Sequence, residues 1–350
     1  MLSTEPEILQ LVETLRRSPW VALDTEADSL HCYPEKLCLV QLSHAGGDEL
    51  VDPLSPAPLA PLFEHLAGRE LTLHGASFDL RLLRRSRGMV ASAVFDTELA
   101  ARLIGRPHAG LRDLVLEILG VTLDKGAQKA HWSQRPLTPK MEDYARGDTH
   151  HLKPLREALE AELVRLGRQA WHRETCERLV IQSVPGGPDP ERDWRVKGSS
   201  GLRPRALAVV RELWAWREEQ AVARNRPPYF VLSHEAIVAL AEKAARGAPL
   251  ELPPEIRPAQ QKPVEEAVRR ALALPDEALP KQELSQRPPR PSDEVQRRLE
   301  AIRKRRDKKA EELGIDPTLI AARADLAALA EDWDRAVGAL MKWQAELLRP

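Results

Sequence analysis

Short apolar runs separated by turn residues characterise residues 19–54. The runs are PWVALDTE (19–26), KLCLVQLS (36–43) and ELVDPL (49–54), and the breaks between them contain Pro34 and the pair Gly46 and Gly47. Apolar runs of this length, bounded by proline and glycine, are typical of β-strands joined by short connections. We therefore expect three strands here that are antiparallel neighbours.

Helical and strand patterns alternate in the following hundred or so residues. The apolar spacing predicts helices at 57–68, 78–86, 97–105, 111–119 and 139–166. Two short runs, LTLH (71–74) and AVFD (93–96), predict further strands. Three strands in succession, followed by strand–helix alternation, predict an α/β domain with a mixed sheet flanked by helices.

The second half of the chain has a different pattern. Residues 183–198, SVPGGPDPERDWRVKG, have the composition of a linker, and a proline-rich break covers 285–294. Between and after these breaks the spacing is helical, and Ser233 is placed to cap a helix. We expect three domains: an α/β domain at 1–190 and small all-α domains at 196–280 and 290–350.

Composition narrows the class of protein. Hydrophobic residues make up 43% and charged residues 30% of the 350 residues, which suits a soluble globular protein with more than one core. No apolar run approaches the ~20 residues of a membrane span, and the N-terminal segment lacks the form of a signal peptide. The net charge of −1 gives no overall basic signature. Three sparse cysteines are expected to be reduced thiols in a cytoplasmic protein.

The most informative acids end the first apolar run. Asp24 and Glu26 are separated only by Thr25, and alternate side chains of a strand share a face. Two carboxylates that face the same way repel each other, and burial increases the cost. A solvent-exposed strand end would explain the pair without any function, so further acids must converge on it to indicate a site.

Three more residues are candidates to join the pair. Asp79 follows the fourth expected strand where a helix begins, a position that the helix dipole also favours. Tyr144 and Asp148 are four residues apart on an expected helix and share a face, which could equally be a solvated one. Carboxylates suit hard divalent cations such as Mg²⁺ and Mn²⁺. Two ions ~3.5–4 Å apart can hold a phosphodiester for hydrolysis.

These acids also lie in motifs that resemble the DEDD exonucleases. The segments are DTE at 24–26, HGASFDLRLL at 74–83 and YARGD at 144–148, and the tyrosine of the last one matches the DEDDy branch. Surrounding segments such as YPEKLCLVQLS, FDTELAARLIGRP and GVTLDKGAQKAHWSQRPLTP are similar to ribonuclease D. The resemblance implies an RNase H-like fold and 3′–5′ hydrolysis that releases nucleoside 5′-monophosphates.

The same resemblance assigns expected roles. Two divalent metal ions, Mg²⁺ or Mn²⁺, would be held by Asp24, Glu26, Asp79 and Asp148. Asp24 would bridge the ions. Tyr144 would orient the attacking water, since a phenol is normally protonated near neutral pH.

Other residues near these motifs have weaker claims. Leu30 is a candidate wedge against terminal bases, and Ala27 stands where many family members carry a bulky apolar residue. His74 is expected to be a polar residue at a strand end, and Asp96 a helix cap before Thr97. Asp28, Asp52 and Glu98 also lie near strand or helix ends and compete for the metal roles.

The helical half resembles HRDC domains. The match covers roughly 200–275 and includes PPYFVLSHEAIVALA, and the final section resembles the degenerate second HRDC domain of bacterial ribonuclease D. Trp214 and Trp216 could stack on bases, although at least one is expected in a core. RKRRDKK (303–309), and Arg203 and Arg205 beside Lys197, could contact phosphates or simply be solvated.

Together these features predict a monomeric, cytoplasmic 3′–5′ exoribonuclease of the ribonuclease D type. The expected partner is RNA with a free 3′ end, and the resemblance suggests tRNA precursors. Two alternatives stay open: a DNA 3′–5′ exonuclease, because the same four acids serve such enzymes, and a nucleic-acid-binding protein with a silent nuclease fold.

Overall fold

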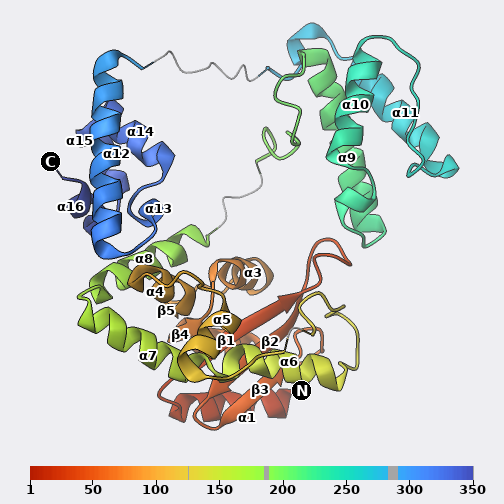
Figure 1. Cartoon of the computed structure of the whole chain (residues 1–350). Helices are drawn as coiled ribbons and strands as arrows, with labels where there is room; N and C mark the ends of the chain where they lie inside the picture. The colour runs from red at the N-terminus through yellow and green to blue at the C-terminus, as the bar shows by residue number, and fades with distance from the viewer. Residues whose placement is uncertain (125, 185–188, 283–290, 350) are drawn as a thin grey trace. The chain divides into compact units, whose positions relative to one another are not determined.

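The computed structural model describes residues 1–124, 126–184, 189–282 and 291–349 (Figure 1). The contacts between residues divide the chain into two compact units. The first unit comprises Met1–Ala27, Leu37–Pro185 and Arg290–Pro350, and the second comprises Asp28–Lys36 and Gly186–Pro289. This division follows packing rather than modules of sequence, so the expected three-domain organisation stays a prediction.

A five-stranded sheet forms the centre of the first unit. Its strands are β1 (Val21–Ala27), β2 (Leu37–His44), β3 (Gly47–Val51), β4 (Glu70–Leu73) and β5 (Ala93–Asp96). They lie in the order β3-β2-β1-β4-β5, with β2 antiparallel to β1 and β3, and with β4 parallel to β1 and β5. The expected antiparallel trio and mixed sheet are confirmed.

Helices flank this sheet. Up to residue 185 they are α1 (Glu5–Arg17), α2 (Ala60–Ala67), α3 (Ser77–Arg87), α4 (Thr97–Ile104), α5 (Leu111–Leu114), α6 (Pro139–His150), α7 (Leu152–Arg165) and α8 (Gln169–Gln182). The expected helix at 111–119 continues beyond α5 as a π-helical turn, Val115–Leu119, and the helical stretch at 139–166 is divided at His151. Helices α1 and α8 are additions to the sequence-based expectation.

The N-terminal helix α1 shows why its sequence is helical. Glu7 accepts hydrogen bonds from the Thr4 amide at 2.9 Å and the Thr4 hydroxyl at 2.7 Å, so the first turn is capped. Apolar residues at helical spacing form its buried stripe: Ile8, Leu11, Val12 and Leu15. This stripe packs into the same core as β1 and β2.

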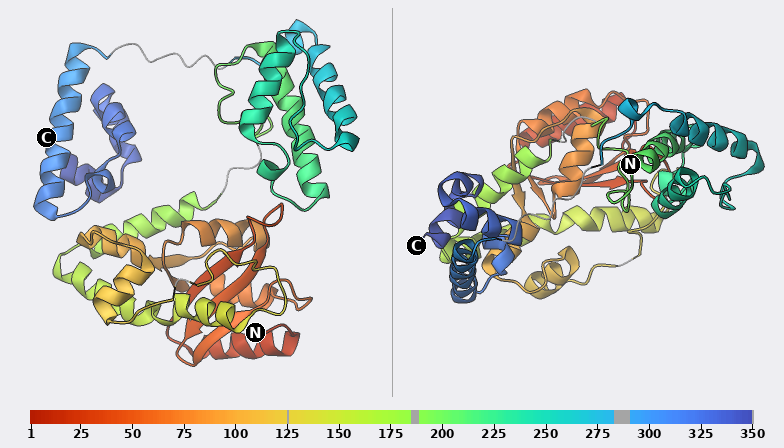
Figure 2. Two further views of the ribbon diagram at one scale, coloured as in Figure 1. Left: turned by 45° about the vertical axis from the view of Figure 1, so that its right-hand side comes forward. Right: turned by 90° about the horizontal axis from the view of Figure 1, so that it is seen from above.

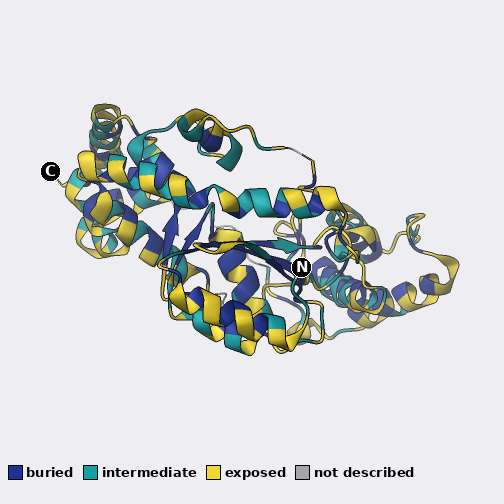
Figure 3. Cartoon of the chain, turned by 90° about the horizontal axis from the view of Figure 1, so that it is seen from below, coloured by how far each residue is buried: buried dark blue, intermediate teal, exposed yellow. Residues whose placement is uncertain are grey.

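Burial follows the layers of the first unit. Every residue of β2 is buried, so this strand is covered on both faces. Figure 3 shows the corresponding pattern in the helices, which carry buried residues on one side and exposed residues on the other. The three cysteines are free and buried, as expected for reduced thiols.

The C-terminal segment packs onto the helices of the sheet domain within the first unit. Its helices are α12 (Asp293–Leu313), α13 (Pro317–Ile320), α14 (Arg323–Glu331), α15 (Trp333–Ala336) and α16 (Lys342–Leu348), with a 3₁₀ turn at Val337–Ala339. Buried Arg168 donates to Leu103 O at 2.7 Å and to Leu313 O at 2.8 Å, and Trp171 stacks on Trp343 at 5.0 Å between ring centroids. One apolar cluster therefore spans both parts.

The second unit is a small helical domain. It contains α9 (Pro204–Ala223), α10 (His234–Ala245) and α11 (Pro258–Leu272), which lie side by side in both views of Figure 2, and 3₁₀ turns at Pro228–Phe230 and Asp276–Ala278. Ser233 caps α10 by accepting from the Ala236 amide at 3.1 Å, as expected. Trp216 is buried in the core, which confirms that at least one tryptophan of α9 is structural. Within the described ranges, no helix has the length and hydrophobicity that crossing a membrane requires.

Candidate active site

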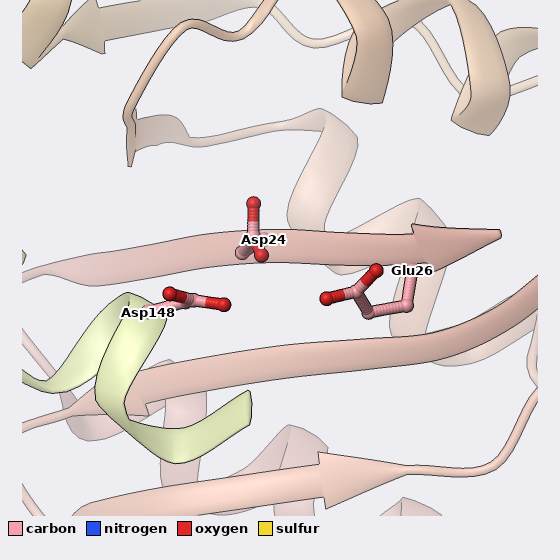
Figure 4. Close-up of side chains that lie close together, drawn as sticks. All are labelled: Asp24, Glu26 and Asp148. Atoms are coloured by element: carbon pink, nitrogen blue, oxygen red, sulfur yellow. The ribbon is translucent and has the colours of Figure 1, made fainter. Parts of the chain in front are cut away.

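Strand β1 turns two carboxylates toward one side of the sheet. Asp24 and Glu26 are half-buried, and the intervening Thr25 is buried. Figure 4 shows the carboxylates of Asp24 and Glu26 together with that of Asp148 from α6. Opposite Asp24 on β2 lies Gln41, whose Nε2 donates to Asp24 Oδ2 at 3.4 Å. The alternation of the strand therefore places both acids on one face, as the sequence predicts.

Helix α6 brings Tyr144 and Asp148 to the same place. The helix starts after Thr138, whose hydroxyl accepts from the Met141 amide at 3.3 Å, and Pro139 fits its first turn. Near its end the Thr149 hydroxyl lies 2.7 Å from that of Ser43 on β2. This anchor holds α6 against the sheet, so that Tyr144 and Asp148, one helical turn apart, both line the cleft beside β1.

Helix α3 supplies Asp79, which is buried in its first turn. The turn before α3 is fixed by Asp96, whose carboxylate accepts from the amides of Gly75 at 3.0 Å and Ala76 at 2.8 Å. The Thr25 hydroxyl donates to Asp79 Oδ1 at 2.5 Å. Asp79 is therefore oriented from β1 and from the β4–α3 turn together.

A cleft of about 690 Å³ collects these groups. All five site residues predicted from the sequence line it. The remaining lining residues are Thr25, His74, Phe78, Gly110, Leu111, Arg112, Asp113 and Gln128. Oxygen atoms of Asp24, Glu26 and Asp148 lie within 4.8 Å of one another, whereas Asp79 is outside this closest group.

The four predicted metal ligands hold protons more tightly than free carboxyls. Burial, with Asp148 and Asp79 nearby, raises the pKa of Glu26 to about 9. Burial also raises the pKa of Asp79 to about 6 and that of Asp148 to about 7. For Asp24, burial and then the charges of its acidic neighbours raise the pKa well above the usual range.

This donor set fits divalent cations. Among the ion pairs of the described residues, none involves Asp24, Glu26, Asp79 or Asp148, so no Lys or Arg is paired directly with these like charges. Mg²⁺ and Mn²⁺ prefer oxygen ligands, so carboxylates that converge without a cationic partner would suit either ion.

The repulsion predicts a pH-dependent stability effect of Glu26→Gln without metal. Folded Glu26 keeps its proton up to about pH 9, whereas unfolded Glu26 loses it near its ordinary value of 4.5. The folded state then binds more protons, so stability falls as pH rises between those values. Glutamine removes this loss. In chelator, the melting temperature of Glu26→Gln minus that of the natural protein should increase from about pH 5 to about pH 8.5.

The same pair of proteins provides the control. With Mg²⁺ present, binding stabilises the natural protein, so the difference should shrink or reverse at high pH. Asp143→Asn, at an exposed position of α6, should follow the natural protein throughout. A difference between Glu26→Gln and the natural protein that does not change with pH would contradict the raised pKa.

Most competing acids have structural roles. Asp96 caps α4 by accepting from the amides of Glu98 at 2.8 Å and Leu99 at 3.2 Å, which confirms its predicted role. Asp52 forms a paired contact with Arg135 at 2.6 and 2.8 Å. The Asp28 carboxylate accepts from the Lys36 amide at 3.0 Å. None of these three acids lines the cleft.

The basic candidates are largely engaged within the protein. In the run at 303–309, Arg305 donates to Leu348 O at 2.7 Å and Arg306 to Ala321 O at 3.0 Å. Arg205 donates to Leu272 O at 3.3 Å. These contacts favour structural roles. Leu30 belongs to the second unit, and its role as a wedge stays a prediction.

The sequence analysis did not name six of the lining residues, and three of them, Phe78, Arg112 and Gln128, can contact a substrate through their side chains. Phe78 is 41% exposed beside the buried Asp79, and Arg112 and Gln128 come from the segment between α4 and α6. An exposed aromatic next to a motif acid is a usable signal for Phe78. Arg112 and Gln128 have no such signal, because only tertiary folding returns their segment to β1.

Family models match both parts of the chain. The family described as 3′-5′ exonuclease matches residues 1–164, and the HRDC domain matches residues 206–247. Among solved structures, a protein from Bifidobacterium adolescentis has a TM-score of 0.83 at 26% identity and covers 99% of this chain and 94% of its own. Escherichia coli RNase D is described as an exoribonuclease involved in structured RNA processing. Its structure has a TM-score of 0.77 at 28% identity and covers 100% of this chain and 91% of its own.

Curated relatives agree over nearly the full length. Ribonuclease D of Gluconacetobacter diazotrophicus is 34% identical, with 98% of this chain and 89% of the relative aligned. Ribonuclease D of Pseudomonas paraeruginosa is also 34% identical, with 94% of this chain and 91% of the relative aligned. Similarity of this extent covers the exonuclease and HRDC parts together. The chain belongs to the ribonuclease D family of metal-dependent 3′–5′ exoribonucleases.

Proposed function

We propose that Asp24, Glu26, Asp79 and Asp148 hold two divalent metal ions, Mg²⁺ or Mn²⁺, at which RNA is hydrolysed from its 3′ end. The observation that supports this most directly is the convergence of the Asp24, Glu26 and Asp148 oxygens within 4.8 Å, in a cleft that Asp79 also lines. Bound ions of this kind acidify water and stabilise the leaving oxygen of a phosphodiester. The products would be nucleoside 5′-monophosphates.

Other residues of the cleft would position the metal ligands and bind the substrate. Asp24, central on β1, is the proposed bridging ligand, and Gln41 and Thr25 hold the carboxylates of Asp24 and Asp79 in place. Among described residues, Arg112 is the one Lys or Arg that lines the cleft, so it is the natural contact for a substrate phosphate. Phe78 offers an aromatic face on which a base could stack.

Tyr144 is suited to position water rather than to remove its proton. Burial, followed by the charges of Asp148, Glu26 and Asp24, raises the pKa of Tyr144 above its ordinary value of 10. The phenol therefore stays protonated at neutral pH and can both donate and accept a hydrogen bond. Its ring lies 6.1 Å from that of buried Trp132, which limits its freedom.

Tyr144→Phe should slow the chemical step more than it weakens binding of RNA. Removing one hydrogen bond that orients the attacking water should lower the single-turnover rate about 10²-fold, with a much smaller change in affinity. Rapid-quench kinetics with enzyme in excess measures the rate, and filter binding in Ca²⁺ measures affinity. An unchanged single-turnover rate would remove Tyr144 from the mechanism.

The proposed physiological substrate is precursor tRNA with extra 3′ nucleotides, trimmed by a monomer in the cytoplasm. Escherichia coli RNase D, the structural relative at 28% identity, is described as acting in structured RNA processing, and this supports a structured RNA as substrate. The curated relatives are ribonucleases D over nearly their full length, which supports RNA over DNA.

The test is a time course on a 3′-extended tRNA labelled at its 5′ end, with Mg²⁺, with Mn²⁺ and with chelator. A ladder that shortens from the 3′ end only with metal supports direction, chemistry and metal use together. Matched DNA and RNA strands in the same assay compare the two nucleic acids. RNA that is bound but not shortened in either metal, while DNA is degraded, would replace this proposal with a DNA exonuclease. Binding without hydrolysis of either would indicate a silent nuclease fold.

A further inference from the structure

His74 stands at the border between the cleft and a second pocket. It follows β4, is half-buried, and lines the 690 Å³ cleft and the neighbouring pocket of about 550 Å³. Gly110 is the only other described residue that lines both. A side chain in this place would contact a ligand that extends from the acidic cluster toward the second pocket.

One nitrogen of the His74 ring is held by the fold. Nδ1 lies 2.9 Å from the hydroxyl oxygen of Thr97, and that hydroxyl donates its single proton to Leu73 O at 3.1 Å. With the hydroxyl proton directed at the Leu73 carbonyl, the Thr97 oxygen is an acceptor toward His74, and we infer that Nδ1 carries the proton and donates. In a neutral imidazole with Nδ1 protonated, Nε2 carries the lone pair and accepts.

The His74 ring is neutral near pH 7. Burial lowers the pKa of His74 below its usual 6.5, against the opposing charge of Asp96. Thr97 is fully buried, so the Nδ1 contact is shielded from water. His74 thus presents one fixed tautomer rather than a mixture of two.

The second nitrogen has no hydrogen-bond partner among the residues that the structure describes. Nε2 also does not belong to the buried polar atoms that lack a partner. Nε2 is therefore not fully buried, and His74 lines both cavities. The cleft consequently offers an uncharged acceptor in addition to its carboxylates.

Few groups of a nucleic acid can donate to such an acceptor. Phosphate oxygens only accept, base edges donate in some nucleotides and not in others, and the terminal 3′-hydroxyl donates in RNA and DNA alike. The ribose 2′-hydroxyl donates in every ribonucleotide and is missing from DNA, so it is the group by which a protein distinguishes the two. A cleft of this volume suits about one nucleotide.

We propose that His74 Nε2 accepts a hydrogen bond from the 2′-hydroxyl of the 3′-terminal nucleotide, and that His74 is a residue through which the cleft selects RNA. The inference rests on the proposed function, because it takes the cleft as the place of the terminal nucleotide. It assigns His74 to recognition of substrate, where the sequence suggests only a polar strand end.

The experiment compares RNA strands that differ only at the 3′-terminal sugar: ribose, 2′-deoxyribose and 2′-fluoro-ribose. The fluoro sugar keeps a ribose-like pucker but cannot donate. The natural protein should prefer the terminal ribose about 10-fold in kcat/KM over both analogues, the size expected for one neutral hydrogen bond. His74→Phe should reduce the preference to about 2-fold. His74→Gln, whose amide oxygen can accept near the Nε2 position, should restore part of it.

The results separate this inference from the proposed function. A preference for ribose that is the same in His74→Phe would overturn the role of His74 while leaving exoribonuclease activity intact. An equal slowing on all three sugars would also overturn it, because His74 would then serve chemistry or folding. Circular dichroism and melting temperature verify that both variants fold.

A binding readout keeps the inference testable without turnover. In ¹⁵N spectra of the protein with Mg²⁺, the His74 ring should show a protonated Nδ1 and an unprotonated Nε2. AMP should shift the Nε2 signal, and dAMP should not. Equal shifts with both nucleotides, or a protonated Nε2, would reject the inference even if the enzyme degraded no RNA in the assay.

Discussion

Asp24→Asn is expected to reduce exoribonuclease turnover by at least ~10³-fold, equivalent to ~4 kcal/mol of transition-state stabilisation. Asp24 occupies the centre of the acidic group, between Glu26 on its own strand and Asp148 on α6. An amide has the same shape but no charge, so the site would lose the ligand that is proposed to bridge the two ions. The measurement is the single-turnover rate with metal in excess.

The same substitution should not damage the fold. Burial and acidic neighbours make charged Asp24 unfavourable without metal, so neutral asparagine removes a source of repulsion. The melting temperature of Asp24→Asn in chelator should equal or exceed that of the natural protein. Asp143→Asn, the exposed acid of α6, should keep activity within about 2-fold, as surface substitutions usually do. Near-normal turnover of Asp24→Asn with metal in excess would refute the proposed site.

Gly105→Ala is expected to destabilise the first unit by about 2–5 kcal/mol. Gly105 ends α4 with φ of +90°, which only glycine adopts without strain. A Cβ built there would lie 2.1 Å from the backbone oxygen of Gly314, at the end of α12. Because a backbone atom cannot rotate away, the C-terminal helices would have to separate from α4.

Gly120→Ala is the matched control for this effect. Gly120 also ends a helical turn with positive φ, at +69°, but a Cβ there meets no atom within 4 Å. It should cost only the left-handed backbone term, about 1–2 kcal/mol. Urea unfolding followed by circular dichroism compares the two. Hydrogen exchange in α12 should increase in Gly105→Ala alone, and equal losses of stability would show that the close approach has little energetic weight.

The sequence predicts the sheet well because its strands carry local signals. Each strand is a short apolar run bounded by turn residues, and Ala93–Asp96 has the bounds expected for it. Helix α8 was not expected because its apolar residues do not form a regular stripe. Its buried residues are His172 and Cys176, and neither is a typical sign of a core helix.

The predicted site residues were found through their motifs, and the structure places all five in one cleft. The sequence could not reveal Arg112, because the segment that carries it has no pattern linking it to β1. Nor could it assign a role to His74. The fixed tautomer of that ring depends on Thr97, 23 residues away, and on the carbonyl of Leu73.

The sequence by itself determined the strands, the order of the motifs and the pairing of Asp24 with Glu26 on one face, since these follow from the two-residue period of a strand. Only the tertiary structure decided against which elements the last helical section packs. The sequence breaks predict a separate domain at 290–350, and the structure adds that α12–α16 share an apolar cluster with α4 and α7. A linker-like composition reflects only local backbone preferences. Packing of helices depends on complementary surfaces that are far apart in the chain, as at the close approach of Gly105 and Gly314.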